Sequence, residues 1–362
     1  MNQIHQQDLE AFFNLYEQAH ICPYYFRGKP EVRQIITNCI NKTPVENDLD
    51  FVYLFRYMLK RLIGQLDSHS MIRTRNEYER LPLQITSHNS LFTVTATGEQ
   101  YTNFLNKVVT KINGINLEQL AKESENVISY STDGYLELEA SRFLSHYDPL
   151  RTLPSIDSET TQIAYTFSDG NELKVEIGEP GFIDQAKPAN YQLDLDNGHL
   201  LLHYTACQEE YPNQMQEVVE QIRNLIPHHN VNLFTLDLRG NMGGDDRIIQ
   251  PLVDCLKTQP LLKKQVFVDR AVQSAALFAL NDMTKLGAKV FDTAIGSSLN
   301  HIGNNRRLEL PSGRFLTIVA TRYFYLDEQN NFVTIRTPED FKNLDKKYIT
   351  PKYIHLDGII PH

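Results

Sequence analysis

The stretch VNLFTLDLRGNMGG, residues 231–244, is the part of the sequence that most clearly indicates the fold. Its first half is an apolar run of strand length, and its second half contains Gly240, Gly243 and Gly244. An apolar strand followed by a glycine-rich turn is typical of sheets whose strands alternate with helices. The stretch therefore predicts a strand that ends near Leu238 and a loop whose main chain can approach a ligand closely.

The residues on both sides of this stretch continue the alternation. Apolar strands are predicted at residues 200–206, 265–269 and 288–292, and helical spacing of apolar residues is found at 213–226, 246–256 and 274–287. Strands that alternate with helices favour an α/β core with a largely parallel sheet. We place this core at residues 181–362.

The chain before residue 181 divides into two further predicted regions. Residues 1–83 are expected to be helical, because Phe51, Phe55 and Met58 continue one apolar stripe. Residues 84–180 mix strand and helix patterns and are expected to form a mixed α+β segment. The stretch EPGFIDQAKPAN, residues 179–190, is the best candidate for a connecting segment.

Composition excludes several classes of partner. The 362 residues carry a formal net charge of -10, which disfavours nucleic acids and anionic membrane surfaces. Neither an apolar run of membrane-spanning length nor a secretory signal is visible, so a cytoplasmic protein without membrane insertion is expected. The four cysteines are scattered, and no metal or cofactor is predicted.

The stretch VDRAVQSAALFALN, residues 268–281, places Ser274 where a loop enters a predicted helix. The positive end of the helix dipole favours a developing negative charge at this position, as a serine nucleophile requires. The simpler alternative is that Ser274 only caps the helix, which is a common role of serine. Taken alone, this stretch favours the capping role.

A third stretch, QLDSHS at residues 65–70, contains a candidate base. His69 follows a predicted helix and could accept the proton of a serine hydroxyl near neutral pH. Asp67 or Ser68 could orient its ring. The alternative is an ordinary histidine at a helix C-terminus.

Together the three stretches resemble the tail-specific, or C-terminal processing, serine peptidase family, which includes the tricorn core. The matching elements are the DLRGN-type loop at residues 237–244, Ser274-Ala275-Ala276 at a helix start, and Asp67-Ser68-His69-Ser70 upstream. The stretches KVVTKING at 107–114 and GSSLNHIGN at 296–304 are also similar to family segments. Because members of the family usually carry a PDZ domain before the core, the resemblance makes residues 84–180 a degenerate PDZ-like domain or a linker region.

The resemblance implies a crotonase-like core of repeated strand-strand-helix units and hydrolysis of peptide bonds through an acyl-enzyme. Position by position, it makes Ser274 the nucleophile. The N–H groups of Ala275 and of either Gly243 or Gly244 would form the oxyanion hole. Peptides or proteins would be the substrates, and a homo-oligomer is one expected form.

The sequence departs from the family at the base. Processing peptidases use a lysine in a T-F-G-K-G-like segment, and the matching residues 294–298 contain none. The tricorn-like branch uses an upstream histidine, which fits His69. Its late acidic residue has only loose candidates here, Glu309, Asp327 and Glu328, and His301 is a second candidate base.

Two other functions stay open from the sequence. A non-catalytic ligand- or peptide-binding protein on the same fold is favoured by the missing lysine, whereas Ser274 and His69 argue for an enzyme. An acyl-CoA enzyme of the wider crotonase class rests on analogy of fold alone.

Overall fold

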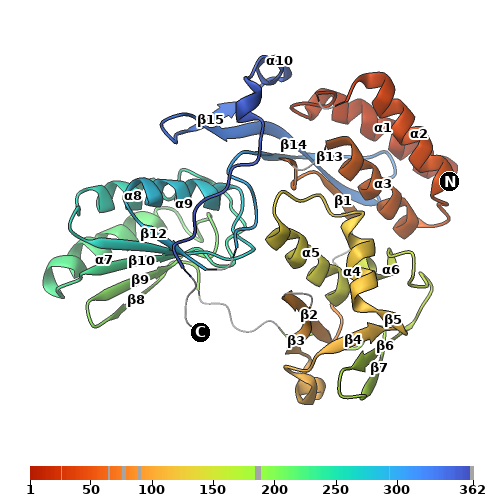
Figure 1. The fold of residues 1–362 in the computed structure, drawn as a ribbon, viewed down its shortest axis with the longest axis horizontal. Helices are drawn as coiled ribbons and strands as arrows, with labels where there is room; N and C mark the ends of the chain where they lie inside the picture. The colour runs from red at the N-terminus through yellow and green to blue at the C-terminus, as the bar shows by residue number, and fades with distance from the viewer. Residues whose placement is uncertain are drawn as a thin grey trace. The chain divides into compact units, whose positions relative to one another are not determined.

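The structure is a computed structural model that describes residues 1–358 apart from residues 26, 64–65, 76–78, 89–90, 184–188 and 293. Its contacts divide the chain into two compact units (Figure 1). The first unit contains residues 1–185, 300–324 and 334–350, and the second contains residues 186–299, 325–333 and 351–362. Each unit therefore combines stretches that are distant in the sequence. The domain limits predicted at residues 83 and 180 stay predictions.

The second unit is built on a five-stranded sheet in the order β12-β11-β10-β9-β8 (Figure 1). Four of its strands run parallel, as predicted, and β8 pairs antiparallel with β9. The strands are β8 (Gln192–Asp196), β9 (His199–His203), β10 (Leu233–Asp237), β11 (Lys263–Phe267) and β12 (Lys289–Phe291).

Three helices supply the other side of the apolar core of this unit. They are α7 (Gln214–His228), α8 (Gln250–Lys257) and α9 (Ala275–Lys285). Leu200, Phe234 and Val266 from the strands pack in one fully buried cluster with Ile222 of α7 and Leu280 of α9. Burial of such side chains contributes roughly 1.5–3 kcal/mol each, so this cluster holds the strand ends rigidly.

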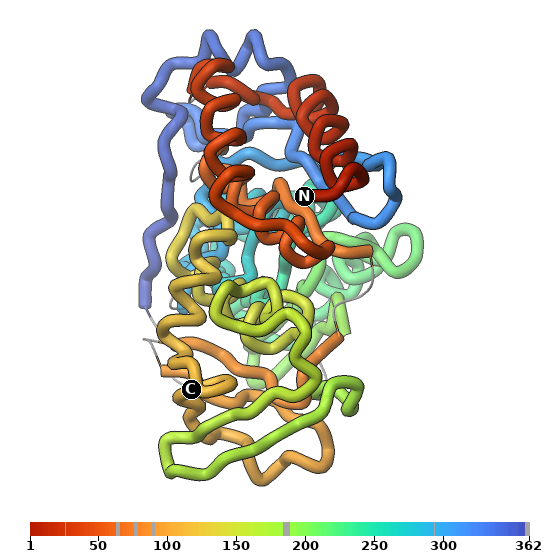
Figure 2. The backbone as a smooth tube through the Cα atoms, turned by 90° about the vertical axis from the view of Figure 1, so that its right-hand side faces the viewer, coloured from red at the N-terminus to blue at the C-terminus, as the bar shows by residue number. Residues whose placement is uncertain are grey.

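The first unit contains the predicted N-terminal helices and a second sheet. The helices are α1 (Gln3–Ala19), α2 (Lys29–Lys42) and α3 (Asp48–Ile63). The sheet has the order β1-β14-β13, with β15 also paired to β14. These strands are β1 (Met71–Thr74), β13 (His301–Leu308), β14 (Phe315–Leu326) and β15 (Phe332–Ile335), followed by α10 (Pro338–Lys342). In Figure 2 the late strands lie beside the N-terminal helices, and α1 contacts β13.

Residues 81–177 of the first unit enclose an apolar core of their own, in which Leu144, Ile163 and Tyr165 are fully buried. The helices here are α4 (Leu117–Glu125), α5 (Asp133–Ser145) and α6 (Tyr147–Arg151). The strands are β2 (Leu83–His88), β3 (Leu91–Thr97), β4 (Val109–Ile112), β5 (Ile115–Asn116), β6 (Gln162–Phe167) and β7 (Glu172–Glu176). The mixed α+β character predicted for this stretch is present, and its relation to PDZ domains stays a prediction.

The mixed α/β class is confirmed, and the crotonase-like type of the core stays a prediction. Part of the connecting segment predicted at residues 179–190 lies outside the described residues. None of the helices within the described ranges is both long and apolar enough to span a membrane.

Candidate functional site

The two loops that carry the predicted nucleophile and oxyanion hole leave the same edge of the five-stranded sheet. β10 and β11 are parallel neighbours, and Asp237 lies opposite Phe267 at their ends. The Leu238 N–H continues this ladder to the carbonyl of Phe267 at 2.9 Å. Because parallel strands bring their carboxyl ends to one edge, the glycine loop at 238–244 and the serine loop at 268–274 lie next to each other.

The two loops are fastened together by hydrogen bonds. The half-buried Asp269 carboxylate accepts from the Gly240 N–H at 3.1 Å and from the Ala271 N–H at 2.9 Å. The Gln273 N–H donates to the carbonyl of Asn241 at 3.2 Å. Burial raises the pKa of Asp269, and the two N–H groups oppose that rise.

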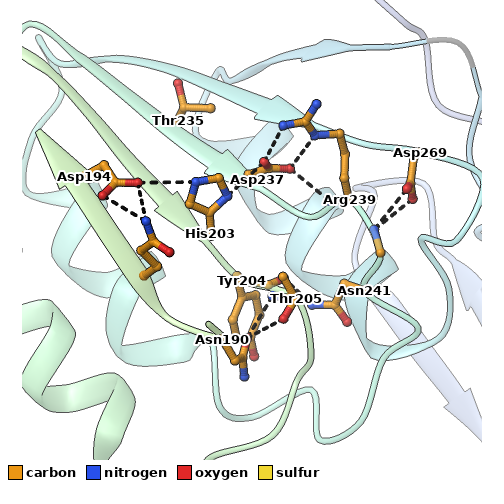
Figure 3. Close-up of polar contacts among 12 residues, drawn as sticks. Asn190, Asp194, His203, Tyr204, Thr205, Thr235, Asp237, Arg239, Asn241 and Asp269 are labelled. Carbon is orange, nitrogen blue, oxygen red and sulfur yellow. Dashed lines mark hydrogen bonds and ion pairs between the residues drawn. The ribbon is translucent and has the colours of Figure 1, made fainter. Parts of the chain in front are cut away.

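A buried amide holds the glycine loop from inside (Figure 3). The Asn241 side chain is fully buried, donates to the Tyr204 carbonyl at 2.7 Å and accepts from the Gly243 N–H at 2.8 Å. The main chain of Cys207 pairs with Gly243 and Asp245, at 3.0 and 2.8 Å. These four hydrogen bonds fix Asn241, Gly243 and Asp245 of the loop.

The start of the loop is held by a charged cluster (Figure 3). Arg239 donates two hydrogen bonds to the Asp237 carboxylate, at 2.9 and 2.7 Å. The same carboxylate lies 3.1 Å from Nδ1 of His203, whose Nε2 lies 3.4 Å from Asp194. A two-point Arg–carboxylate pair fixes direction as well as distance, so the Arg239 guanidinium stays beside Asp237 at the end of β10.

Gly243 passes directly against Ser274. A Cβ atom on Gly243 would lie 2.7 Å from the Cβ of Ser274 and 2.9 Å from the N atom of Ala275. The φ angles of Gly243 and Gly244 are +100° and +143°, which side chains rarely allow. Glycine is therefore required at both positions. The structure brings three residues predicted from the sequence, Gly243, Ser274 and Ala275, to one place.

Ser274 precedes α9, but it does not cap the helix. Its side chain makes no capping hydrogen bond, and its backbone has φ 51° and ψ -125°. An N-cap residue normally has an extended backbone, and its side-chain oxygen accepts a hydrogen bond from a main-chain N–H of the first turn. A positive φ at a non-glycine residue costs about 1–3 kcal/mol, which tertiary packing must offset. The capping alternative for Ser274 is wrong.

Two main-chain N–H groups in the glycine loop and at the start of α9 have no acceptor within the described residues. They belong to Gly244 and to Ala275, the first residue of α9. The Gly243 N–H, in contrast, already donates to Asn241. Of the two glycines named from the sequence, Gly244 is therefore the one with an N–H group left for a ligand.

The two lysines weighed from the sequence, Lys285 and Lys289, are not favoured as bases for Ser274. Lys285 and Lys289 are exposed, and Lys285 ends α9. Eleven helical residues separate Ser274 from the end of that helix, which is roughly 16 Å along its axis. The segment that carries lysine in processing peptidases packs here on the serine loop, because the Gly296 N–H donates to the Val272 carbonyl at 3.1 Å. Ser298 contacts the main chain of Lys352.

The first unit forms a tight turn around Asp67. One oxygen of this fully buried carboxylate accepts from the N–H groups of His69 and Ser70, both at 2.8 Å. Its other oxygen lies 3.1 Å from Nε2 of the buried His20. Ser70 in turn accepts from the Ala320 N–H of β14 at 3.0 Å. Asp67 therefore orients the main chain of the turn rather than the His69 ring.

The ring of His69 stacks on that of His301, the first residue of β13. The ring centroids are 5.7 Å apart and the planes are inclined by 19°. His301 is completely buried and also lies 5.3 Å from the ring of Phe324. Both histidines considered as bases from the sequence thus lie together in the first unit.

Burial sets the protonation of this turn. It lowers the pKa of His69, and the Asp67 charge and the Ile302 main chain offset part of that effect. Burial raises the pKa of Asp67, but hydrogen bonds from His20 and Ser70 outweigh it and bring the value below its usual range. Near pH 7 the turn therefore combines a neutral imidazole with a buried carboxylate.

The remaining residues predicted as supporting groups lie in different surroundings. The Ser68 hydroxyl is buried and has no hydrogen-bond partner within the described part of the chain. Glu328 is exposed in the turn between β14 and β15, where Asp327 accepts from the main chain of Gln329 and Asn331. Glu309 is exposed and paired with Arg75 and Arg307. Within the described residues, no cluster of His, Cys, Asp or Glu has a metal-binding arrangement.

Sequence reasoning missed His20 and Asp269. His20 follows an unremarkable N-terminal helix, and nothing near it in the sequence indicates a partner 47 residues away. Asp269 belongs to the stretch at residues 268–281, close after the strand that neighbours the glycine loop. A carboxylate at the end of a parallel strand could have been predicted to bond to the adjacent loop.

Comparison with known proteins identifies the fold. No protein-family model and no curated protein matches the chain. Mature CPAF complexed with lactacystin is similar over 94% of this chain and 96% of its own, with a TM-score of 0.63 and 10% identity. A serine-to-alanine mutant of CPAF gives 0.64 and 10%, over 94% and 95% of the two chains. This chain has the CPAF fold.

A photosystem II D1 C-terminal processing protease also aligns, over 94% of this chain and 90% of its own. Its identity is 12% and its TM-score is 0.44, which is too low to carry an argument about the fold.

Proposed function

We propose that this protein is a serine peptidase of the tail-specific type that hydrolyses peptide bonds through an acyl-enzyme on Ser274. The observation that carries the proposal is the conformation of Ser274. Its backbone has a positive φ, its side chain does not cap α9, and a glycine that tolerates no side chain passes beside it. Strain of this kind is retained where surrounding structure holds a residue in place for function.

The same geometry supports an oxyanion hole. The N–H groups of Gly244 and Ala275 are free of acceptors in the described structure, and Ala275 begins a helix of 11 residues. The N-terminal end of a helix adds positive potential where a carbonyl oxygen becomes negative. We assign these two groups to the hole and give Gly243 the role of a spacer.

His69 is the general base in this proposal, which places the protein in the tricorn-like, histidine-using branch of a crotonase-like core. Two findings support this choice over a lysine. The Gly296–Ser298 segment is occupied in structural hydrogen bonds, and Lys285 lies at the far end of α9. A neutral imidazole, favoured by burial of His69, can accept a proton without first losing one.

The reaction then follows in two steps. His69 accepts the Ser274 hydroxyl proton while Oγ attacks the peptide carbonyl, and the oxyanion is held by the two N–H groups. The imidazolium returns the proton to the leaving amine, and an acyl-enzyme remains. Water, deprotonated by the same imidazole, hydrolyses the ester and restores Ser274. Ser68, His301 and Glu328 stay candidates for support of the base.

The test is covalent labelling together with peptide hydrolysis. A fluorophosphonate probe, and lactacystin because it is found in complex with CPAF, should label the wild-type chain at Ser274. Ser274→Ala should abolish both labelling and hydrolysis. Ser298→Ala is the matched control, since it removes a buried hydroxyl of the same unit and should still be labelled.

The second candidate is a ligand- or peptide-binding protein on the same fold, which the absence of a lysine base favours. A binder has no need of a strained, uncapped serine beside free N–H groups. If wild-type and Ser274→Ala chains bound a peptide equally and neither was labelled or active, the binding function would replace the peptidase.

A further inference from the structure

The N-terminal helix α1 contributes a buried histidine to the turn that holds the proposed base. His20 follows the last residue of α1, and it is 1% exposed. Its Nε2 lies 3.1 Å from an oxygen of Asp67, which is itself fully buried. The other Asp67 oxygen accepts from the N–H groups of His69 and Ser70. One carboxylate therefore joins α1 to the turn.

The tautomer of His20 follows from its second contact. Nδ1 accepts a hydrogen bond from the Cys22 N–H at 3.1 Å, so it carries no proton. Nε2 must then carry the proton and donate it to Asp67. The ring is held from the side by Tyr16, with the centroids 4.6 Å apart. His20 is thus a neutral donor fixed in one orientation.

Contacts with β13 and β14 also restrain the turn. Ser70 accepts one hydrogen bond from β14, and the His69 ring is restrained by stacking on His301. Without the His20 donor, Asp67 would be a buried carboxylate with one unsatisfied oxygen, which costs more than the loss of an ordinary hydrogen bond. The carboxylate would then rotate or take up a proton, and the N–H groups of His69 and Ser70 would lose their common acceptor.

We propose that His20 is a positioning residue for catalysis, which sets the position of the His69 base because it fixes, through the Asp67 carboxylate, the main chain of the turn that carries His69. The inference rests on the proposed function of His69. On this inference, His20, at the end of the first helix of the chain, is one of the residues that determine turnover. Its effect is on the geometry of the base and not on substrate contact, so it should appear in kcat and leave KM nearly unchanged.

The chain contains a matched control on the same helix. His5 of α1 is also 1% exposed, its Nε2 lies 2.8 Å from Asp48, and its ring stacks on Phe51 with centroids 4.7 Å apart. A His5→Leu change therefore removes a contact between a buried histidine and an aspartate at a place away from the turn. Asp48 is partly exposed and also pairs with Arg314, so thermal unfolding of both leucine variants separates a loss of stability from a loss of kcat.

The experiment measures kcat, KM and thermal unfolding for wild-type, His20→Leu, His20→Gln and His5→Leu chains. We expect His20→Leu to lower kcat about tenfold or more, because small misplacements of a catalytic group have effects of this size. His20→Gln keeps an N–H donor near the Nε2 position and should recover most of the loss. His5→Leu should retain kcat within about twofold of wild type.

Two results would overturn the inference while the proposed function stands. One is an equal loss of kcat in His20→Leu and His5→Leu, and the other is no recovery in a folded His20→Gln chain. A wild-type chain that neither cleaves peptides nor is labelled at Ser274 would instead remove the proposed function, and this inference with it.

Discussion

The Ser274 site and the His69 turn are built in opposite ways. Ser274 and its glycine loop are held by contacts between two adjacent strand ends, made by main-chain groups and by the side chains of Asn241 and Asp269. The His69 turn is held by the side chains of His20 and His301 and by the Ala320 N–H of β14, which lies 250 residues from Ser70 in the sequence. A nucleophile can thus be fixed by local backbone geometry, whereas the histidine turn depends on long-range packing.

The largest expected effect tests which histidine serves Ser274. His69→Ala should lower kcat/KM by roughly 100-fold to 10,000-fold, the usual contribution of a general base. His301→Ala should lower it less, since that ring stacks on His69 and is a second candidate rather than the proposed base. Peptide hydrolysis by both variants, with Lys285→Ala and Lys289→Ala as controls near wild-type activity, gives the ranking. Full activity in His69→Ala would reassign the base.

A single methyl group added to the glycine loop should lower activity almost as much as the loss of His69. Gly243→Ala places a Cβ 2.7 Å from that of Ser274, so we expect about a hundredfold loss of kcat or more, as when an oxyanion donor is displaced. Gly240→Ala is the matched control, because its φ is +80° but nothing lies within 4 Å of the added atom. It should cost about 1–2 kcal/mol of stability and little activity. Equal activity of the two variants would contradict the close approach.

The pH profile reports on the His69 turn. Burial lowers the pKa of His69, so its neutral form persists below the ordinary value near 6.5. Activity should be complete at pH 7 and should fall only as the pH drops through this lowered pKa. Asp67→Asn removes a charge that raises the pKa, and should move the acid limb to still lower pH while reducing kcat. An acid limb that moved upward in this variant would contradict the assignment.

The smallest effect concerns the contact between the turn and β14. Ser70→Ala leaves the Ala320 N–H without its acceptor and should lower the free energy of unfolding by about 1–2 kcal/mol, with a few-fold loss of kcat. Ser312→Ala is a suitable control, because the Ser312 hydroxyl also joins segments that are distant in the sequence. It donates to Asp8 and accepts from the main-chain N–H of residue 314, away from the turn. Chemical denaturation and peptide hydrolysis measure the two quantities. Equal kcat values in both variants would show that β14 contributes only stability.

The α/β alternation of the second unit could be predicted from the sequence because it depends on local patterns. The apolar runs at β10 and β11, and the helical spacing in α7 and α9, need no partner to be recognised. The positions of Gly243 and Gly244 were also apparent, since glycine marks backbone angles that other residues avoid. The strands β13, β14 and β15 were not predicted. Their pairing joins residues 301–335 to β1, and no local pattern indicates that register.

By itself, the sequence determined the parallel sheet, the glycine loop after β10 and the serine at the start of α9, because periodicity and glycine act over a few residues. Only the tertiary structure decided that Ser274 has a positive φ and does not cap its helix, and that Gly244 rather than Gly243 has an unused N–H. It also decided that His20 holds Asp67 and that His301 stacks on His69. Packing brings these groups together from distant parts of the chain. Each buried polar group needs a partner, because the cost of burying it unpaired is large relative to the net stability of a folded protein.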